Sequence, residues 1–336
     1  MDITYYNSRL DIDLDKIGEN ISKIQQYTGG LTVLPVIKSN AYGFGTSAIA
    51  NYLVQACGLR FLAVARIFEA AQIQDSGCTS PEIMILGPVP SYSIPHAVER
   101  GIQIPLFLKR DAELLSREAR RLGLPYVKAH LKIETGMNRI GVKPGEELED
   151  LLNFVKSLGN VVIDGVFTHF ATADVAEHGA GNDFTRLQFQ RFLQALDQVK
   201  AAGITPRFIH CCNTGGTTWL KEAYSVCTHV RVGSLYLGYS SVQDDWNPVG
   251  VEEPASWKTL IGYGDGYQRS FAMNGAPVLI SGQRCPFVGT AMDQSFVDVT
   301  GVDCAIGDEV TLFGEDGHGN RISGLEIGHL MGETRL

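Results

Sequence analysis

The chain has 336 residues, of which 44% are hydrophobic and 19% charged, and its formal net charge is −9. This length exceeds one ordinary domain and suits a barrel of about 250 residues with a smaller second domain. The composition excludes a disordered chain, and the acidic balance argues against a surface for nucleic acid or anionic membranes, which needs clustered Lys and Arg.

The seven cysteines form no CxxC pair, and an odd number cannot close a disulfide framework. A reducing cytoplasm fits this cysteine usage best. The first residues, MDITYYNSRLDIDL, place acids where a secretory signal carries basic and then apolar residues, and no apolar run approaches about 18 residues. We therefore expect a cytoplasmic protein without a membrane-spanning segment.

Short apolar, β-rich runs recur along the chain, each followed by a more polar segment with helical spacing. They are LTVLPVIK (31–38), FLAVAR (61–66), EIMILG (82–87), IQIPLF (102–107), VKAHLKIET (127–135), VVIDGVFTHF (161–170), RFIHCCN (207–213) and HVRVGSLYLG (229–238). This alternation predicts a closed parallel (β/α)8 barrel of the TIM type over residues 10–238. A doubly wound open sheet gives a similar pattern, but its nucleotide-binding form carries GxGxxG after the first strand, where this chain has KSNAYG. We favour the barrel.

The pattern changes after residue 238. Gly and Asp turns now separate β-rich runs such as APVLISG (276–282), FVDVT (296–300) and DEVTLFG (308–314). These runs predict a smaller, mostly antiparallel β domain over residues 239–336, to which we expect a strand from residues 1–9 to add.

Polar side chains close the apolar runs, at the strand ends where barrels carry their functional sites. Lys38 directly follows VLPVI. A lysine at a strand end usually just reaches water, but in apolar surroundings its pKa can fall enough to make it a nucleophile toward an aldehyde cofactor. Other strand ends carry Lys132 and Arg139 around a glycine turn, His169, His210, Asn213, Thr214, and Arg231 followed by Gly233 and Ser234. A glycine turn after the last strands is where barrels commonly bind phosphate.

Longer segments extend these strand ends. They are VLPVIKSNAYGFG (33–45), LKIETGMNRIGV (131–142), FTHFATAD (167–174), VRVGSLYLGY (230–239), IGYGDGYQR (261–269) and VGTAMDQSFVDVT (288–300). Over these segments the sequence resembles the alanine racemases, fold type III pyridoxal 5′-phosphate (PLP) enzymes with a barrel and a C-terminal β domain. The resemblance implies a PLP-dependent racemase that interconverts L- and D-alanine, or a related small amino acid, by two-base proton transfer at Cα.

The resemblance also assigns the cofactor-binding residues. Lys38 would be the Schiff-base lysine and one of two catalytic bases. The cofactor phosphate would be bound by Tyr42, Thr214, Gly233 and Ser234. Arg231 would face the pyridine nitrogen, with His169 hydrogen-bonded behind it. Because a guanidinium stays charged, it would keep that nitrogen unprotonated and make the cofactor a poorer electron sink, which suits plain proton exchange.

Racemisation needs a second base on the opposite face of the substrate. Tyr263, in GYGDG, matches the family's second base, which in the family reaches the barrel of the other subunit, so a homodimer is implied. Arg139 would lie near the phenolic oxygen of the cofactor and the substrate carboxylate, and Lys132 matches a lysine that is carbamylated in many members. Met292 and Asp293 match the pair that helps to bind the substrate carboxylate. No metal is implied.

The sequence departs from the family pattern in three places. The segment between Tyr239 and Ile261 is short, the last residues HLMGETRL contain no counterpart of the family's active-site entrance tyrosine, and Ala291 replaces a small polar or sulfur residue. From these departures we expect a reduced second domain and a wider entrance that could admit serine or a larger amino acid.

Two other functions stay open on the sequence. One is a non-racemising PLP enzyme on the same scaffold, such as a decarboxylase, an aldolase or a biosynthetic tailoring enzyme. Arg231 speaks against decarboxylation, because relatives that need a strong electron sink place an acid opposite the ring nitrogen. The other is a PLP carrier, but single-barrel carriers lack the domain that contains GYGDG.

Overall fold

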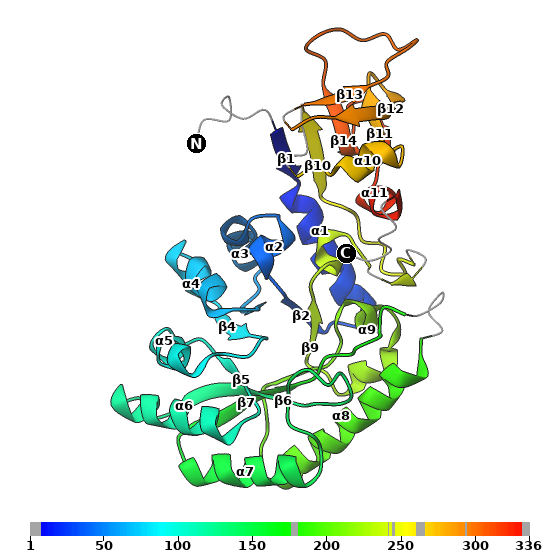
Figure 1. The fold of residues 1–336 in the computed structure, drawn as a ribbon. Helices are drawn as coiled ribbons and strands as arrows, with labels where there is room; N and C mark the ends of the chain where they lie inside the picture. The colour runs from blue at the N-terminus through cyan, green and yellow to red at the C-terminus, as the bar shows by residue number, and fades with distance from the viewer. Residues whose placement is uncertain are drawn as a thin grey trace. The chain divides into compact units, whose positions relative to one another are not determined.

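The chain divides into two compact units, one formed by Gly18–Val251 and the other by Met1–Ile17 together with Glu252–Leu336 (Figure 1). The computed structural model describes residues 8–175, 181–240, 242–243, 246–259, 266–292 and 294–330.

The larger unit is a (β/α)8 barrel, as the alternating sequence pattern predicted. Its described parallel strands are β2 (Thr32–Pro35), β3 (Phe61–Val64), β4 (Glu82–Ile85), β5 (Ile104–Leu106), β6 (Val127–Lys132), β7 (Val161–Phe167), β8 (Phe208–His210) and β9 (His229–Val232). Neighbouring strands follow chain order, and the parallel pairing of β2 with β9 closes the ring. The Arg231 N–H donates to the Cys212 carbonyl at 2.9 Å and joins β9 to the segment after β8.

Helices alternate with these strands and surround them (Figure 1). They are α1 (Leu14–Tyr27), which begins in the other unit, α2 (Ser39–Tyr42), α3 (Thr46–Gln55), α4 (Ile67–Asp75), α5 (Ile94–Glu99), α6 (Lys109–Arg121), α7 (Glu146–Leu158), α8 (Asp183–Ala201) and α9 (Thr214–Trp219), with short 3-10 turns η2 (Ser91–Ser93), η4 (Lys221–Ser225) and η5 (Leu235–Leu237). Local sequence supports several ends: Asn182 caps α8 by accepting the Thr185 N–H at 2.8 Å. Helix α7 has three glutamates in its first turn and Lys156 in its last, which suits the helix dipole.

The inside of the barrel is filled by side chains. One buried cluster comprises Leu34, Val36, Phe61, Ala63, Met84, Phe167 and Phe208. The rings of Phe61 and Phe208 stack with centroids 4.3 Å apart. Because the barrel interior is filled by this core, a functional site is expected at the strand ends and in the loops that follow them.

The smaller unit is an antiparallel β domain, also as predicted. Its strands are β1 (Ser8–Ile12), β10 (Ala255–Thr259), β11 (Pro277–Ile280), β12 (Gln283–Thr290), β13 (Ser295–Val297), β14 (Val310–Glu315) and β15 (Arg321–Ile322), and its helices are α10 (Arg269–Met273) and α11 (Gly324–Leu330). The sheet order is β1-β10-β14-β11-β12-β13, with β15 paired to β14. Strand β1 pairs with β10 in this sheet, with Leu10 opposite Trp257. Most of the expected N-terminal strand, residues 1–7 of 1–9, lies outside the described residues.

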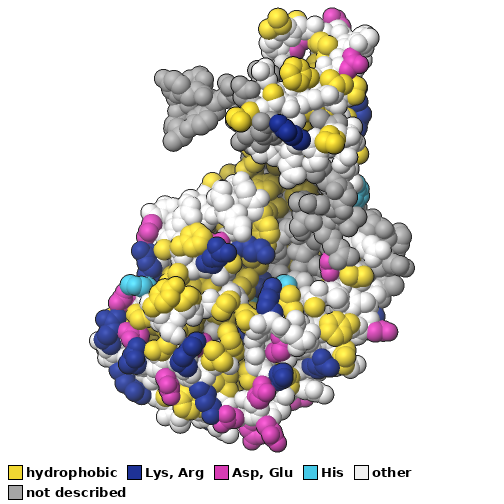
Figure 2. All heavy atoms as spheres, in the orientation of Figure 1, with side chains coloured by type: hydrophobic (Ala, Val, Ile, Leu, Met, Phe, Trp, Pro, Cys, Tyr) yellow, Lys and Arg dark blue, Asp and Glu magenta, His cyan; other side chains and the backbone are white. Residues whose placement is uncertain are grey.

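Two features of the structure bear on membranes and nucleic acids as partners. In the described part of the chain, every helix is too short or too polar to cross a membrane. On the face of the barrel unit shown in Figure 2, Lys and Arg side chains are interspersed with Asp and Glu side chains.

Candidate active site

Lys38 lies three residues after β2 and directly precedes a turn of unusual handedness. The φ angles of Ser39, Asn40, Ala41 and Tyr42 lie between 52° and 57°, so α2 is a single left-handed turn. Each non-glycine residue in this conformation costs about 1–2 kcal/mol. Backbone bonds hold the turn, among them Tyr42 N–H to the Lys38 carbonyl at 2.9 Å. Backbone strain of this kind is typical of functional sites, where the surrounding structure maintains it.

A buried carboxylate fixes the start of this turn. Glu69, on α4, is 3% exposed and accepts hydrogen bonds from the Ser39 N–H at 2.8 Å, the Ala65 N–H at 2.8 Å and the Arg66 N–H at 3.0 Å. It therefore links the residue after Lys38 to the neighbouring β3–α4 loop. Glu69 was not among the expected site residues, because its only local signal is its third position in a helix, where a carboxylate often caps the N-terminus.

The surroundings of the Lys38 amine favour its neutral, nucleophilic form. Partial burial and the nearby Arg139 charge lower the pKa of Lys38, and Glu69 opposes part of this shift. Its Nζ lies 5.4 Å from the centroid of the Tyr42 ring. A lysine with a lowered pKa is more often a neutral amine near pH 7 and can then attack a carbonyl carbon.

Hydroxyl and backbone N–H groups gather at the ends of β8 and β9. The Gly233 N–H and the Ser234 hydroxyl each donate to Thr214 Oγ1 at 3.3 Å. The Tyr42 hydroxyl lies directly over Gly233, where an added Cβ would come 2.0 Å from it. Burial raises the pKa of Tyr42 to about 12, so its hydroxyl keeps a proton to donate. Such a cluster of donors around a glycine is suited to an anionic phosphate.

Arg231, the third residue of β9, is buried and tightly held. Its guanidinium donates to His210 Nδ1 at 2.7 Å, the His210 carbonyl at 3.1 Å and the Thr168 carbonyl at 2.8 Å, and lies 3.1 Å from His169 Nδ1. Burial lowers the pKa of Arg231 to about 10, so it stays charged at neutral pH. Burial and the Arg231 charge hold the pKa values of His169 and His210 well below the usual range. Both imidazoles are therefore neutral and accept hydrogen bonds from the guanidinium.

The histidine contacts continue into the barrel. His210 Nε2 lies 3.3 Å from His130 Nδ1, and both rings are fully buried. Because a guanidinium can only donate, His210 Nδ1 accepts, the His210 proton lies on Nε2, and that proton is donated to His130. The remaining proton of His130 is then on Nε2, an atom without a hydrogen-bond partner among the described residues. Arg231 thus fixes the tautomers of two core histidines.

The other two expected cations are Lys132, the last residue of β6, and Arg139, in the turn that follows it. Lys132 is 3% exposed, and its Nζ donates to the Ile133 carbonyl at 3.2 Å. Burial and the Arg231 charge lower the pKa of Lys132 to about 7. Glu134 accepts the Gly136 N–H at 2.5 Å and the Arg139 N–H at 3.3 Å, and so shapes the turn that carries the exposed Arg139 side chain. Glu134 is a second residue that the sequence analysis did not single out.

The structure brings most of the expected site residues together in the barrel unit. They are Lys38, Tyr42, Lys132, Arg139, His169, Thr214, Arg231, Gly233 and Ser234. Met292 lies in the smaller unit, between β12 and β13, and is 63% exposed. Tyr263 and Asp293 lie outside the described residues.

Two family models match most of the chain. The model of the alanine racemase N-terminal domain matches residues 12–241, and that of the C-terminal domain matches residues 256–334. The chain belongs to the alanine racemase family. The alanine racemase of Symbiobacterium thermophilum is 33% identical over 95% of this chain and 90% of that protein. That of Desulfovibrio desulfuricans is 36% identical over 90% of this chain and 88% of its own.

Solved structures give the same family. The alanine racemase of Clostridium difficile 630 superposes with a TM-score of 0.85 at 27% identity, covering 97% of this chain and 90% of that one. The alanine racemase of Bacillus anthracis, solved with bound L-Ala-P, gives 0.83 at 28% identity, covering 98% and 90%. The predicted family, fold, enzyme class and cofactor are thereby confirmed: this family member is a PLP-dependent isomerase.

The donor set of the barrel unit fits PLP. An amine with a lowered pKa suits the cofactor aldehyde, and the hydroxyls around Gly233 suit its phosphate. The buried guanidinium of Arg231, backed by neutral imidazoles, suits an unprotonated ring nitrogen as its acceptor.

Proposed function

We propose that this protein interconverts L- and D-alanine with PLP attached to Lys38. The observation that carries this proposal is the arrangement of Arg231, whose buried guanidinium is fixed by His210, His169 and a backbone carbonyl beside the hydroxyl cluster at Gly233. Relatives named alanine racemase support alanine as the substrate. They do not favour a non-racemising PLP enzyme or a PLP carrier.

The chemistry requires removal of a proton from Cα and its return to the opposite face. When bound, PLP withdraws electrons from Cα and so acidifies this proton. Lys38 holds or releases a proton on one face, and the left-handed turn together with Glu69 orients its backbone. Arg231 stays charged and so moderates the electron withdrawal that the cofactor supplies.

The phosphate and carboxylate are bound by separate groups in this proposal. Tyr42, Thr214, Gly233 and Ser234 hold the cofactor phosphate. Arg139 is proposed to hold the substrate carboxylate, and Met292 and Asp293 match the family pair that helps to bind it. Support for Arg139 comes from its electrostatic interaction with Lys38, which shows that the two cations lie near each other.

Lys132 is proposed to carry a carbamate, as the matching lysine does in many family members. Its support is a buried amine with a pKa lowered to about 7, because an amine must be neutral to add to carbon dioxide. The resulting negative charge would compensate Arg139 and Arg231, the two cations that lower the pKa of this lysine.

Tyr263 is proposed as the second base, delivered from the partner subunit of a homodimer. Its support is the match of IGYGDGYQR to the family segment and the match of residues 256–334 to the family's C-terminal domain. A cytoplasmic location is proposed because seven free thiols suit a reducing compartment. The domain boundary at residue 238 likewise stays a prediction.

One experiment tests the reaction. The purified protein with PLP is incubated with single L-amino acids in deuterated water, and both chirality and α-deuterium are followed. Racemisation with deuterium at Cα supports the proposal. Exchange without racemisation shows that the second base is missing, and absence of exchange refutes racemase activity.

Three variants and one substrate comparison test the roles of Lys38 and Tyr263 and the width of the active-site entrance. Lys38→Ala is expected to lose the absorbance of covalently bound cofactor; a borohydride-stable adduct at another lysine would contradict the attachment site. Tyr263→Phe is expected to keep one-face exchange and to lose racemisation, and Tyr239→Phe serves as its control.

A comparison of alanine with serine and larger amino acids tests the prediction of a wide entrance. This prediction is wrong if alanine turns over orders of magnitude faster than all the others. Sedimentation analysis tests the homodimer.

A further inference from the structure

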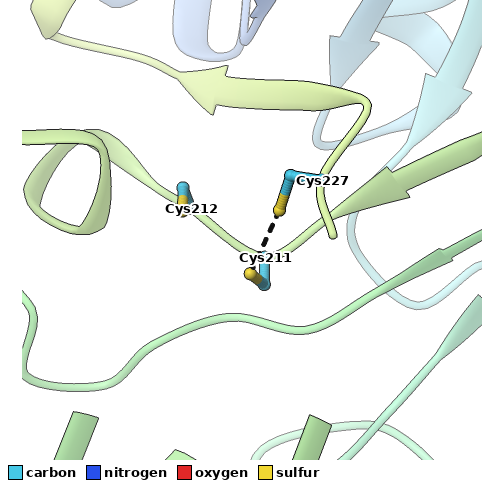
Figure 3. A group of neighbouring side chains, drawn as sticks. All are labelled: Cys211, Cys212 and Cys227. Atoms are coloured by element: carbon cyan, nitrogen blue, oxygen red, sulfur yellow. Dashed lines mark hydrogen bonds between the residues drawn. The ribbon is translucent and has the colours of Figure 1, made fainter. Parts of the chain in front are cut away.

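Three cysteines gather beside the proposed cofactor site and have no part in the reaction (Figure 3). Cys211 and Cys212 directly follow β8, and Cys227 lies two residues before the start of β9. The Sγ atoms of all three lie within 4.8 Å of one another, and those of Cys211 and Cys227 are 3.4 Å apart. All are buried, with exposures of 0%, 0% and 6% in chain order. We call this group the thiol cluster.

The barrel itself sets this arrangement. Strands β8 and β9 are adjacent, and the Thr228 N–H donates to the Ile209 carbonyl at 2.9 Å, just as the Arg231 N–H does to the Cys212 carbonyl. These two bonds fix the register of the segments that carry the cysteines. The three sulfur atoms therefore converge because of the sheet and not because of a mobile loop.

We propose that the thiol cluster is a binding site for one divalent thiophilic cation of the zinc and cadmium class. Sulfur ligands about 2.3 Å from a tetrahedral zinc ion lie about 3.8 Å from one another. The separations in the cluster, 3.4 Å for one pair and no more than 4.8 Å for any pair, bracket that value. Small side-chain rotations would complete the geometry.

The charge balance supports a divalent cation. Binding forms three metal–sulfur bonds and releases three thiol protons to solvent, with no transfer of electrons, and leaves one net negative charge. A buried unpaired charge is costly. Here Arg231, itself buried, interacts electrostatically with all three cysteines, and its positive charge offsets the remaining negative one. The site and its neighbour are then close to neutral together.

The same geometry distinguishes a cation from a disulfide. A disulfide between Cys211 and Cys227 would use two of the three converging sulfur atoms and would need an oxidant. Among the described residues, the cluster contains no histidine or carboxylate, so its ligands are all soft sulfur, which favours thiophilic cations over Mg²⁺ or Ca²⁺. A fourth position is left for a small ligand, as in zinc sites with three protein ligands.

A cation in this cluster would connect two parts of the proposed cofactor site. Cys212 is two residues before Thr214, and Cys227 is four residues before Arg231. A bound ion would tie the segment that offers the Thr214 hydroxyl to the strand that holds Arg231. We therefore expect cation binding to raise the thermal unfolding midpoint and to perturb the absorbance of the bound cofactor.

The test uses the PLP-loaded protein, reduced with a non-chelating phosphine, and cadmium chloride as the probe. Thiolate-to-cadmium charge-transfer absorbance in the ultraviolet should rise and saturate at one cadmium per chain, and the unfolding midpoint should rise in parallel. Cys227→Ser removes one ligand and should weaken binding at least ten-fold. Cys78→Ser is the matched control, because Cys78 is also buried in the barrel unit but lies outside the cluster.

Two results would overturn the proposal. One is the lack of a saturable charge-transfer band, or a band that survives unchanged in Cys227→Ser. The other is a count of five reactive thiols in the denatured, unreduced protein that returns to seven on reduction, without cadmium binding afterwards; the cluster is then a disulfide site. If Cys227→Ser does not fold, Cys212→Ala takes its place in the same titration.

Discussion

Glu69→Gln tests whether the left-handed turn after Lys38 is stabilised by a residue outside the turn. One carboxylate oxygen of Glu69 accepts the Ser39 N–H, and the other accepts the Ala65 and Arg66 N–H groups. Glutamine keeps the shape of the side chain but has one oxygen and one NH2 group. If its oxygen keeps the Ala65 and Arg66 bonds, its NH2 group faces the Ser39 N–H, and two donors oppose each other.

The magnitude follows from the buried groups involved. A buried donor left without an acceptor costs about 1–3 kcal/mol. The loss adds to a turn that already carries about 1–2 kcal/mol per left-handed residue. Because the turn starts directly after Lys38, we expect it to relax and to displace the lysine. A cost of about 1.4 kcal/mol corresponds to ten-fold, so kcat should fall roughly ten-fold or more.

The assay combines urea denaturation with racemisation kinetics and the absorbance of bound cofactor. The matched control is Glu118→Gln, because Glu118 is buried to a similar degree but bonds to the Arg117 and Arg121 side chains on α6. We expect both variants to lose stability and only Glu69→Gln to shift the cofactor absorbance and lower kcat. If Glu69→Gln loses stability but keeps the wild-type spectrum and kcat, Glu69 has no positioning role.

Three further predictions concern the site. In buffer free of carbon dioxide Lys132 is an unmodified amine, and its pKa falls to about 7 on folding. The unfolded chain then binds the extra proton above pH 7, so the free energy of unfolding should rise with pH up to the ordinary lysine pKa. Lys132→Met should remove this rise, worth up to about 1.4 kcal/mol per pH unit, in urea melts at pH 7, 8 and 9; parallel curves would contradict the shift. Gly233→Ala places a Cβ 2.0 Å from the Tyr42 hydroxyl and should weaken PLP binding about ten-fold or more in a spectroscopic titration. Gly317→Ala, at a glycine with open space for a Cβ and no left-handed φ, should leave PLP binding unchanged. Arg231→Lys keeps the charge, but a lysine cannot reach all the acceptors of Arg231. Each buried group left unpaired costs about 1–3 kcal/mol, so the thermal unfolding midpoint of the cofactor-free protein should fall. An unchanged midpoint would refute these hydrogen bonds.

The barrel was predictable because its signals are local. Each parallel strand is buried on both faces and so appears as a continuous apolar run, and the polar residue that ends the run marks the functional end of the barrel. Lys38, Lys132 and Arg231 were found in this way. The resemblance to a known family then assigned these strand ends to a cofactor site, and that assignment of residues stays a prediction.

Other features depend on contacts that local patterns do not contain. The residues SNAY carry no glycine, so nothing in them indicates four positive φ angles; the turn exists because Glu69, thirty residues later, accepts the Ser39 N–H. Helix α6 shows the same limit. The hydrophobic Leu122 that caps it is 36% exposed, whereas the charged Glu118 is buried because Arg117 and Arg121 pair with it.

The histidines behind Arg231 explain why this arginine is a suitable partner for the cofactor ring. A cation that could swing away, or that shared its charge with a carboxylate, would let the ring nitrogen take a proton. Here the guanidinium donates to two neutral imidazoles and two backbone carbonyls, which accept hydrogen bonds without neutralising its charge. In the proposed site the ring nitrogen would therefore face a guanidinium whose direct hydrogen-bond partners are neutral and whose position is fixed by the barrel. A ring nitrogen kept unprotonated withdraws fewer electrons, which favours brief proton removal and return at Cα over reactions that need a long-lived carbanion.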